Sequence, residues 1–552
     1  MNELQQKARQ MSQDFLENDK EYRLGFIEAE QPNPITARLG ETYLEDAREG
    51  IKTLLQVDET LVPKYAKLLQ SPEFDRFADD VFIALSNGGR IILSGCGSTG
   101  RLAMRLEASW RIAARKHPDT AALEDRVISL MTGGDYALIR AVESFEDYIQ
   151  LGKMQSRELS LGKYDILVGI TATGETTSIL GTATQALEDG ASVWMIICTN
   201  PSTILGKLKR ADDVYTHPAC SSLYIPCGGM AVTGSTRMQS STIEQALIGS
   251  ALELALAGFQ QQQMDKDLLI RGFQSCIDTL RKESAMHTMA AQTELETELY
   301  NREGHVTYFA EEYLLDVLAD TTERGPTFSV PPFRPQANTA EPLSWAFVKN
   351  PSLSTHQAWD DCFERQPRCI AKTSEEYAAL GILEKDIRRI PKIDREALMR
   401  FEIGCEPDPE REQGNSLATW IGTGSMAPEA FRRQSEKFRS VSTVMLDDSS
   451  IEKTRMKLFE HLAMKLMINI ISTGTMAKMG RISGNYMVNL KISNKKLIDR
   501  ASRIVADLCG TSYENANYEL FCTKLMLEQE GVIGSETKLT IQRLGRKSPA
   551  QP

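Results

Sequence analysis

The sequence predicts an α/β protein in which two related parallel-sheet domains pack as an internal pseudo-dimer, with helical regions at both chain ends. Three observations support this fold class. Short apolar, β-branched runs alternate with helical patterns from residue 77 to about 258. Landmarks of this stretch return in the same order between residues 302 and 456. Both ends of the chain show helical periodicity instead.

Composition narrows the class of protein. A chain of 552 residues is too long for a single core. The net charge of -12 is spread along the chain, which argues against nucleic acid or an anionic membrane as a partner. No apolar run reaches membrane-spanning length, and the first residues carry no apolar signal. Ten cysteines without a CxxC pair and six histidines without metal-ligand spacing predict a cytoplasmic protein that needs no metal or cofactor.

Four regions follow from these patterns. We expect an N-terminal helical region at 1–76, a first sheet domain at 77–262, a second at 263–478 and a C-terminal helical lid at 479–552. Two prolines in 31–36 predict a break in the first region. The expected strands of the first domain lie at 90–95, 126–132, 165–172, 192–199 and 222–226.

A glycine loop follows the first expected strand. Gly95, Gly97 and Gly100 surround Ser98 and Thr99, and a helical pattern begins directly afterwards. Glycines let the backbone approach a ligand, and the free N–H groups of a helix start suit a phosphate. The stretch therefore predicts a phosphate-binding loop.

The same letters satisfy the dinucleotide motif GxGxxG, so NAD is an alternative. The next strand, however, ends in Thr132, Gly133 and Gly134, without the acidic residue that would hold a ribose. Two more hydroxyl-rich turns, at 171–178 and 233–238, follow later strands. Several such turns favour a phosphosugar over NAD as the ligand. Either ligand is favoured over a glycine loop that has only a structural role.

The internal repeat has unequal copies. Residues 302–328 repeat the strand-turn-helix pattern of 87–110, and 415–438 resemble 163–187. The tripeptide at 236–238 returns at 454–456, each time before a helix that we expect to be amphipathic. The second copy replaces the glycine loop with Glu311 and Glu312, which would repel a phosphate. We therefore expect one phosphate site per chain, and 329–414 as an ordinary solvated connection.

Several motifs resemble those of a known family. GCGSTGRLAM, TGGDYALIRAVESFED, TATGETTS, TGSTRM and STGTMAKMGRISGNYMVNLKISNKKLIDRA are similar to segments of sugar isomerase (SIS) domain proteins. Within that family they are closest to the N-acetylmuramic acid 6-phosphate etherases and the glucokinase regulatory proteins. The resemblance implies two flavodoxin-like SIS domains in tandem, with a helical lid.

The resemblance also implies a set of ligand-binding residues, drawn from the three hydroxyl turns and the lid. The hydroxyl turns would hold the phosphate and border the sugar, and the lid lysine would reach the ligand. The implied residues are Gly97, Ser98, Thr99, Thr171, Thr173, Thr176, Thr177, Ser235, Thr236, Arg237, Lys496 and Arg500.

Two glutamates would carry the chemistry of an etherase. The family is thought to use a syn elimination in which one glutamate removes a proton and the other helps the ether oxygen leave, before water adds. Glu146 matches the first position. At the second glutamate position of the family, the first domain has Ser109. The repeat has Glu323 at the matching position of its own copy of the motif. We therefore expect Glu323 to reach across the pseudo-dimer to Glu146, although a surface carboxylate is an equal alternative.

These inferences leave three functions open. The first is a carbon-oxygen lyase that cleaves the lactyl ether of N-acetylmuramate 6-phosphate or a related sugar phosphate. The second is a non-catalytic sugar-phosphate sensor, in which case a sugar kinase is the expected partner. The third and weakest is a phosphosugar isomerase that uses His461 to open the ring. Because the pseudo-dimer is internal to one chain, the protein is compatible with a monomeric state under each of the three functions.

Overall fold

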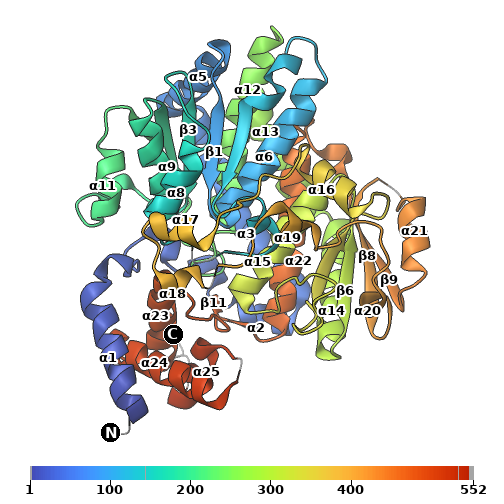
Figure 1. The fold of residues 1–552 in the computed structure, drawn as a ribbon. Coiled ribbons are helices and arrows are strands. Elements are labelled where there is room, and N and C mark those ends of the chain that lie inside the picture. The colour runs from blue at the N-terminus through green and yellow to red at the C-terminus, as the bar shows by residue number, and fades with distance from the viewer. Residues whose placement is uncertain (1–2, 143–144, 389, 425, 533, 546–552) are drawn as a thin grey trace.

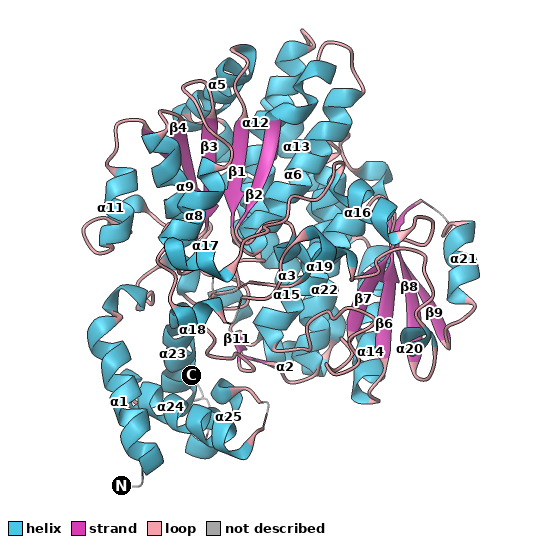
Figure 2. Ribbon diagram, viewed as in Figure 1, coloured by secondary structure: helices cyan, strands magenta, loops and turns pink. Residues whose placement is uncertain are grey.

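The computed structural model describes residues 3–142, 145–388, 390–424, 426–532 and 534–545. Figure 1 shows two sheet-bearing halves side by side and, below the first half, a group of helices from both chain ends. Strands and helices alternate within each half, and helices lie on both faces of the sheets (Figure 2). The predicted α/β class with helical ends is confirmed.

The N-terminal region is helical, as predicted. The expected break around 31–36 falls in a stretch of three 3₁₀ turns, where the Asn33 side chain accepts a hydrogen bond from the Ile35 N–H. Proline at 34 has no N–H to give to a continuing helix. The helices are α1 (Glu3–Asn18), α2 (Leu39–Glu45), α3 (Ala47–Glu59), α4 (Leu61–Leu69) and α5 (Pro72–Ser86).

The first half contains a five-stranded parallel sheet in the order β2-β1-β3-β4-β5. All five predicted strands are present: β1 (Ile91–Gly95), β2 (Val127–Met131), β3 (Ile166–Thr171), β4 (Ser192–Ile197) and β5 (Cys220–Tyr224). The helices are α6 (Ser98–Arg115), α7 (Tyr136–Ile139), α8 (Ile149–Arg157), α9 (Thr177–Glu188), α10 (Pro201–Ile204), α11 (Lys209–Tyr215) and α12 (Gln239–Phe259).

The second half contains a four-stranded parallel sheet in the order β7-β6-β8-β9. Its strands are β6 (His305–Phe309), β7 (Ala346–Lys349), β8 (Ser416–Thr423) and β9 (Ser440–Leu446). Its longer helices are α13 (Lys266–Arg281), α14 (Glu283–Asn301), α15 (Leu314–Phe328), α16 (Thr355–Phe363) and α22 (Leu458–Lys478). Its shorter helices are α17 (Ser374–Ala379), α18 (Glu384–Ile387), α19 (Arg395–Met399), α20 (Pro409–Glu412) and α21 (Glu429–Ser435).

The expectation that 329–414 is only a solvated connection is wrong. This stretch contains β7, which pairs with β6 in the second sheet. It also contains Arg365, whose Nε donates to Glu107 of α6 at 3.0 Å and whose Nη1 lies 2.5 Å from Asp135. Arg368 pairs with the same Glu107 at 2.6 Å. Buried ion pairs therefore fasten this stretch onto the first half.

Two long helices form the centre of the pseudo-dimer. α12 and α22 follow the repeated tripeptide and pack against each other. Nearly every residue of both helices is buried, so the expectation that they are amphipathic is wrong. A helix that is apolar all round belongs in a core, and these two occupy equivalent central positions.

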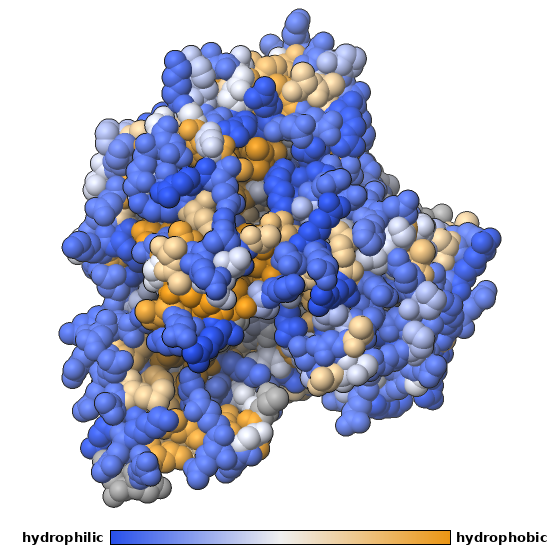
Figure 3. All heavy atoms as spheres, in the orientation of Figure 1, coloured by the Kyte–Doolittle hydropathy of each residue, from blue (hydrophilic) through white to orange (hydrophobic). Residues whose placement is uncertain are grey.

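The C-terminal region folds beneath the first half. A short hairpin of β10 (Ile482–Ser483) and β11 (Tyr486–Met487) leads into α23 (Lys495–Cys509), α24 (Tyr513–Glu530) and α25 (Glu536–Leu544). α24 packs on α1, which brings the two ends of the chain together (Figure 1). Figure 3 shows hydrophilic side chains over most of this face, with apolar ones gathered between the first half and these helices. Within the described ranges, no helix is both long and apolar enough to cross a bilayer.

Candidate functional site

A pocket of about 160 Å³ lies at the carboxyl ends of β1, β2 and β3, bounded by α15 of the second half and α23 of the C-terminal region. Such edges are where parallel sheets bind ligands. Of the residues predicted from the sequence, the following line it: Gly97, Ser98, Thr99, Glu146, Thr171, Thr173, Thr176, Ser235, Thr236, Arg237, Glu323, Lys496 and Arg500. Thr177, in the first turn of α9, is not among the lining residues.

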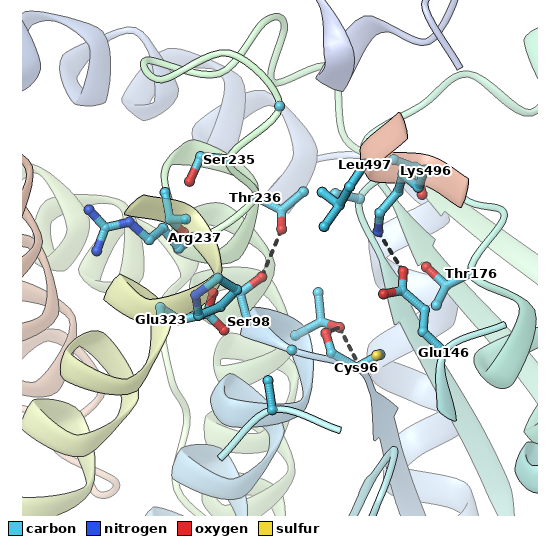
Figure 4. Close-up of a pocket in the computed structure, with 18 of the residues that line it drawn as sticks. Cys96, Ser98, Glu146, Thr176, Ser235, Thr236, Arg237, Glu323, Lys496 and Leu497 are labelled. Atoms are coloured by element: carbon cyan, nitrogen blue, oxygen red, sulfur yellow. Dashed lines mark hydrogen bonds and ion pairs between the residues drawn. The ribbon is translucent and has the colours of Figure 1, made fainter. Parts of the chain in front are cut away.

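The glycine loop forms one wall of the pocket. Gly97 precedes α6 with φ 58° and ψ -122°, a conformation that suits glycine because it has no Cβ. The Thr99 hydroxyl accepts from the Cys96 N–H at 3.0 Å and lies 3.0 Å from the Cys96 carbonyl, so it shapes the loop. The Ser98 hydroxyl instead lies 2.9 Å from the hydroxyl of Thr236, in the third hydroxyl turn (Figure 4). The N-terminus of α6 and two hydroxyls thus face one space.

The turn after β3 supplies more hydroxyls. Thr171 and Thr176 share a hydrogen bond of 2.9 Å, and Thr173 donates to Glu175 at 3.2 Å. Glu175 is neutralised by Arg210, whose Nη2 lies 2.5 Å away. Each hydroxyl can donate as well as accept, so an incoming anion could replace these mutual bonds without leaving a buried polar group unpaired.

Glu146 and Lys496 form an ion pair on one side of the pocket (Figure 4). The lysine comes from α23. Its side chain is 21% exposed, and that of Glu146 is 19% exposed. Burial opposes the charge of Lys496, but the Glu146 carboxylate outweighs it and raises the pKa of the lysine. Burial and the neighbouring Glu146 charge raise the pKa of Asp147 to about 7.

Glu323 stands on the opposite side of the pocket and comes from the second half (Figure 4). A Cβ added at Gly97 would lie 3.8 Å from its Oε1. Arg101 of α6 pairs with Glu323 and donates through Nε to Thr322 at 3.1 Å. A carboxylate of α15, in the second half, thus borders the pocket beside the glycine loop.

The two predicted arginines have their guanidinium groups engaged elsewhere. Arg237 points away from the pocket centre and pairs with Asp320 at 2.9 Å, and burial lowers its pKa (Figure 4). Arg500 donates a hydrogen bond to Glu30. Burial would raise the pKa of Glu30, but the positive charges of Arg500 and Arg503 outweigh that effect and lower this pKa to about 2. Both arginines thus line the pocket, while their guanidinium groups link parts of the chain that are distant in the sequence.

His461 does not border this pocket. Its Nδ1 lies 2.9 Å from Asp316, and its ring packs against Tyr313 in the second half. A ring-opening role for His461 in this pocket is therefore contradicted by its position.

Some lining residues were missed by sequence reasoning. Arg101 directly follows the glycine loop, and that position was the available signal for it. Asn494 lies in the ISNKK motif, where its side chain accepts from the Leu497 N–H at 2.9 Å and caps α23. Glu30 lies in a 3₁₀ turn and had no local signal, because its role depends on two arginines of the C-terminal region.

Two family profiles match parts of the chain. The family profile described as "Glucokinase regulatory protein N-terminal SIS domain" matches residues 76–187. The profile described as "C-terminal lid domain of glucokinase regulatory protein" matches residues 484–528. The first matched stretch contains the glycine loop and Glu146, and the second contains Lys496.

Two similar proteins are named N-acetylmuramic acid 6-phosphate etherase. An N-acetylmuramic acid 6-phosphate etherase of Aeromonas hydrophila is 32% identical over 200 residues, 36% of this chain and 61% of the relative. An etherase of the same name from Yersinia pestis is 31% identical over 225 residues, 41% of this chain and 69% of the relative. The chain thus spans less than two thirds of the Aeromonas relative. The C-terminal domain of a glucosamine-fructose-6-phosphate aminotransferase from Francisella tularensis aligns at 10% identity and a TM-score of 0.40, covering 78% of this chain and 95% of that one.

Proposed function

The chain belongs to the sugar isomerase (SIS) domain family that includes the N-acetylmuramic acid 6-phosphate etherases, and on this premise we propose that its pocket binds a sugar phosphate and cleaves a lactyl ether from it. One observation carries the proposal. Glu146 and Glu323 face the hydroxyl turns from opposite sides of one pocket (Figure 4). The first comes from the first half and the second from the pseudo-symmetric half.

The phosphate end of the ligand is assigned to the glycine loop and the hydroxyl turns. Ser98 begins α6, so a phosphate there would meet the positive end of the helix dipole. Thr171, Thr176 and Thr236 offer hydroxyl donors around the same space. Lys496 adds a positive charge from the lid. Short loops with single hydroxyls suit a monophosphate.

The two glutamates are assigned to the elimination. One carboxylate removes a proton from a sugar carbon, the adjacent C–O bond breaks as the double bond forms, and the departing ether oxygen takes up a proton. Water then adds across the double bond, so that atoms balance as sugar phosphate plus lactate. Arg101 pairs with Glu323 and Lys496 pairs with Glu146, and these ion pairs hold the two glutamates in place.

The test is release of D-lactate from N-acetylmuramate 6-phosphate. Glu146→Gln and Glu323→Gln keep side-chain shape and should each lower kcat by about 100-fold or more, since general acid–base groups contribute this much. Glu298→Gln, on an exposed part of α14, is the matched control and should leave kcat unchanged. Full activity in Glu323→Gln would overturn the composite site.

A second candidate, a sugar-phosphate sensor, is favoured by one specific observation. Lys496 comes from the stretch that resembles the lid of the glucokinase regulatory protein, and it forms an ion pair with the Glu146 carboxylate. A carboxylate held in this way is less available as a base. Tight binding of a sugar phosphate without lactate release would support the sensor, with a sugar kinase as its partner. Either function fits a cytoplasmic location, and ten cysteines without a CxxC pair support that assignment.

A further inference from the structure

A second cavity, of about 370 Å³, lies in the second half at the carboxyl ends of β6 and β7. It occupies the position that the phosphate pocket has in the first half. Glu311 follows β6 and Asn350 follows β7, whereas Arg105 enters from α6 of the first half. Leu314, Leu315 and Leu353 contribute apolar walls. The cavity does not depend on the function proposed above.

Arg105 is the most informative residue in this cavity. It is only 6% exposed, yet its Nε has no hydrogen-bond partner among the described residues. Its ion pair with Asp316 spans 3.7 Å, which is longer than a hydrogen bond. Asp316 is itself bonded to His461 at 2.9 Å. A buried guanidinium with an unmet donor calls for an acceptor, and the cavity is where one could enter.

The remaining polar groups are mainly carboxylates. Glu311 accepts a hydrogen bond from Ser352 at 2.6 Å. Glu311, Asp361 and Glu364 all line the cavity, and burial together with the other two charges raises the pKa of Asp361. They would repel a phosphate but can accept hydrogen bonds. The ligand must therefore offer acceptors to Arg105 and donors to the carboxylates, while carrying no strong negative charge.

A sugar hydroxyl meets both requirements, because it donates one hydrogen bond and accepts others. The leucine walls suit the C–H surface of a pyranose ring. We propose that this cavity is a second ligand site, which binds an unphosphorylated monosaccharide through Arg105, Glu311 and Asp361.

The helices support a paired arrangement of the two sites. Arg101 and Arg105 lie one turn apart on α6, and they pair with Glu323 and Asp316, which lie about two turns apart on α15. The same two helices thus border the phosphate pocket at one end and this cavity at the other.

Isothermal titration of the full chain with glucose, N-acetylglucosamine and their 6-phosphates tests the proposal. Free sugar should bind, and Glu311→Gln and Arg105→Met should each weaken that binding about tenfold or more, as loss of a hydrogen bond involving a charged group does. Ser98→Ala is the matched control: it should weaken binding of the 6-phosphate and leave binding of the free sugar unchanged. Circular dichroism checks that Arg105→Met is folded, and Glu311→Gln lies at a half-buried loop position where folding is not at stake.

No binding of either free sugar at millimolar concentration would overturn the proposal. So would free-sugar binding that survives in Glu311→Gln and is lost in Ser98→Ala, because that pattern would assign the sugar to the phosphate pocket. Neither outcome depends on lactate release, so the second site and the proposed etherase activity fail separately.

Discussion

Replacing Lys496 by methionine should weaken binding of a sugar 6-phosphate substantially. The substitution keeps the aliphatic stem but removes the ammonium, and it leaves Glu146 as an unpaired charge in the pocket. The phosphate loses a hydrogen bond to a charged group, and such a bond contributes about 1.5–3 kcal/mol. This corresponds to a Kd about 10- to 150-fold higher.

The double variant Lys496→Met/Glu146→Gln separates two explanations, with isothermal titration as the assay. If Lys496 contacts the phosphate, the double variant should still bind about tenfold more weakly than the unmodified protein. If Lys496 only neutralises Glu146, the double variant should recover full affinity, and this result would refute the direct contact. Lys495→Met is the matched control, because Lys495 pairs with Asp19 at 2.6 Å and does not line the pocket.

Two further predictions concern stability. The pKa of Glu30 is depressed to about 2, so its ion pairs stabilise the fold above about pH 4.5 and lose that effect as pH falls towards 2. Glu30→Gln should therefore lower the Tm at pH 7 and have a shrinking effect below pH 4, and a Tm difference independent of pH in calorimetry would contradict this reasoning. Glu107→Gln should destabilise the protein by about 3–5 kcal/mol, because it leaves Arg365 and Arg368 without their shared buried carboxylate. Chemical denaturation and limited proteolysis within 366–400 measure this effect, and an unchanged cleavage rate would count against it.

Local patterns were enough to predict much of the fold. Strands β1 and β3 are buried along their whole length and end in glycine or hydroxyl turns, and a fully buried parallel strand has this signature. Because parallel strands end at one edge, the hydroxyl turns could be expected to meet there. β7 was missed, since it has only four residues and follows a proline-rich stretch. Its place in the sheet is decided by pairing with β6, which no local pattern encodes.

Side-chain direction was the part that sequence could not predict. Arg237 and Arg500 were expected among the ligand-binding residues and both line the pocket, but the sequence did not predict that each guanidinium pairs with a carboxylate distant in the sequence. Gly234, with φ +73°, permits this packing, since a Cβ there would come within 2.4 Å of the Arg500 Nε. The position of Glu323 beside the glycine loop could be hypothesised only by treating the repeat as a twofold pair.

The loop at Gly97 and the carboxylate of Glu323 belong to one polypeptide, although they come from different halves. A pocket shared by two separate chains would fall apart on dilution, because its assembly is a bimolecular equilibrium. Here the covalent link makes the encounter intramolecular, with an effective concentration that does not change when the protein is scarce. The pocket should therefore stay whole at the lowest expression level a cell uses.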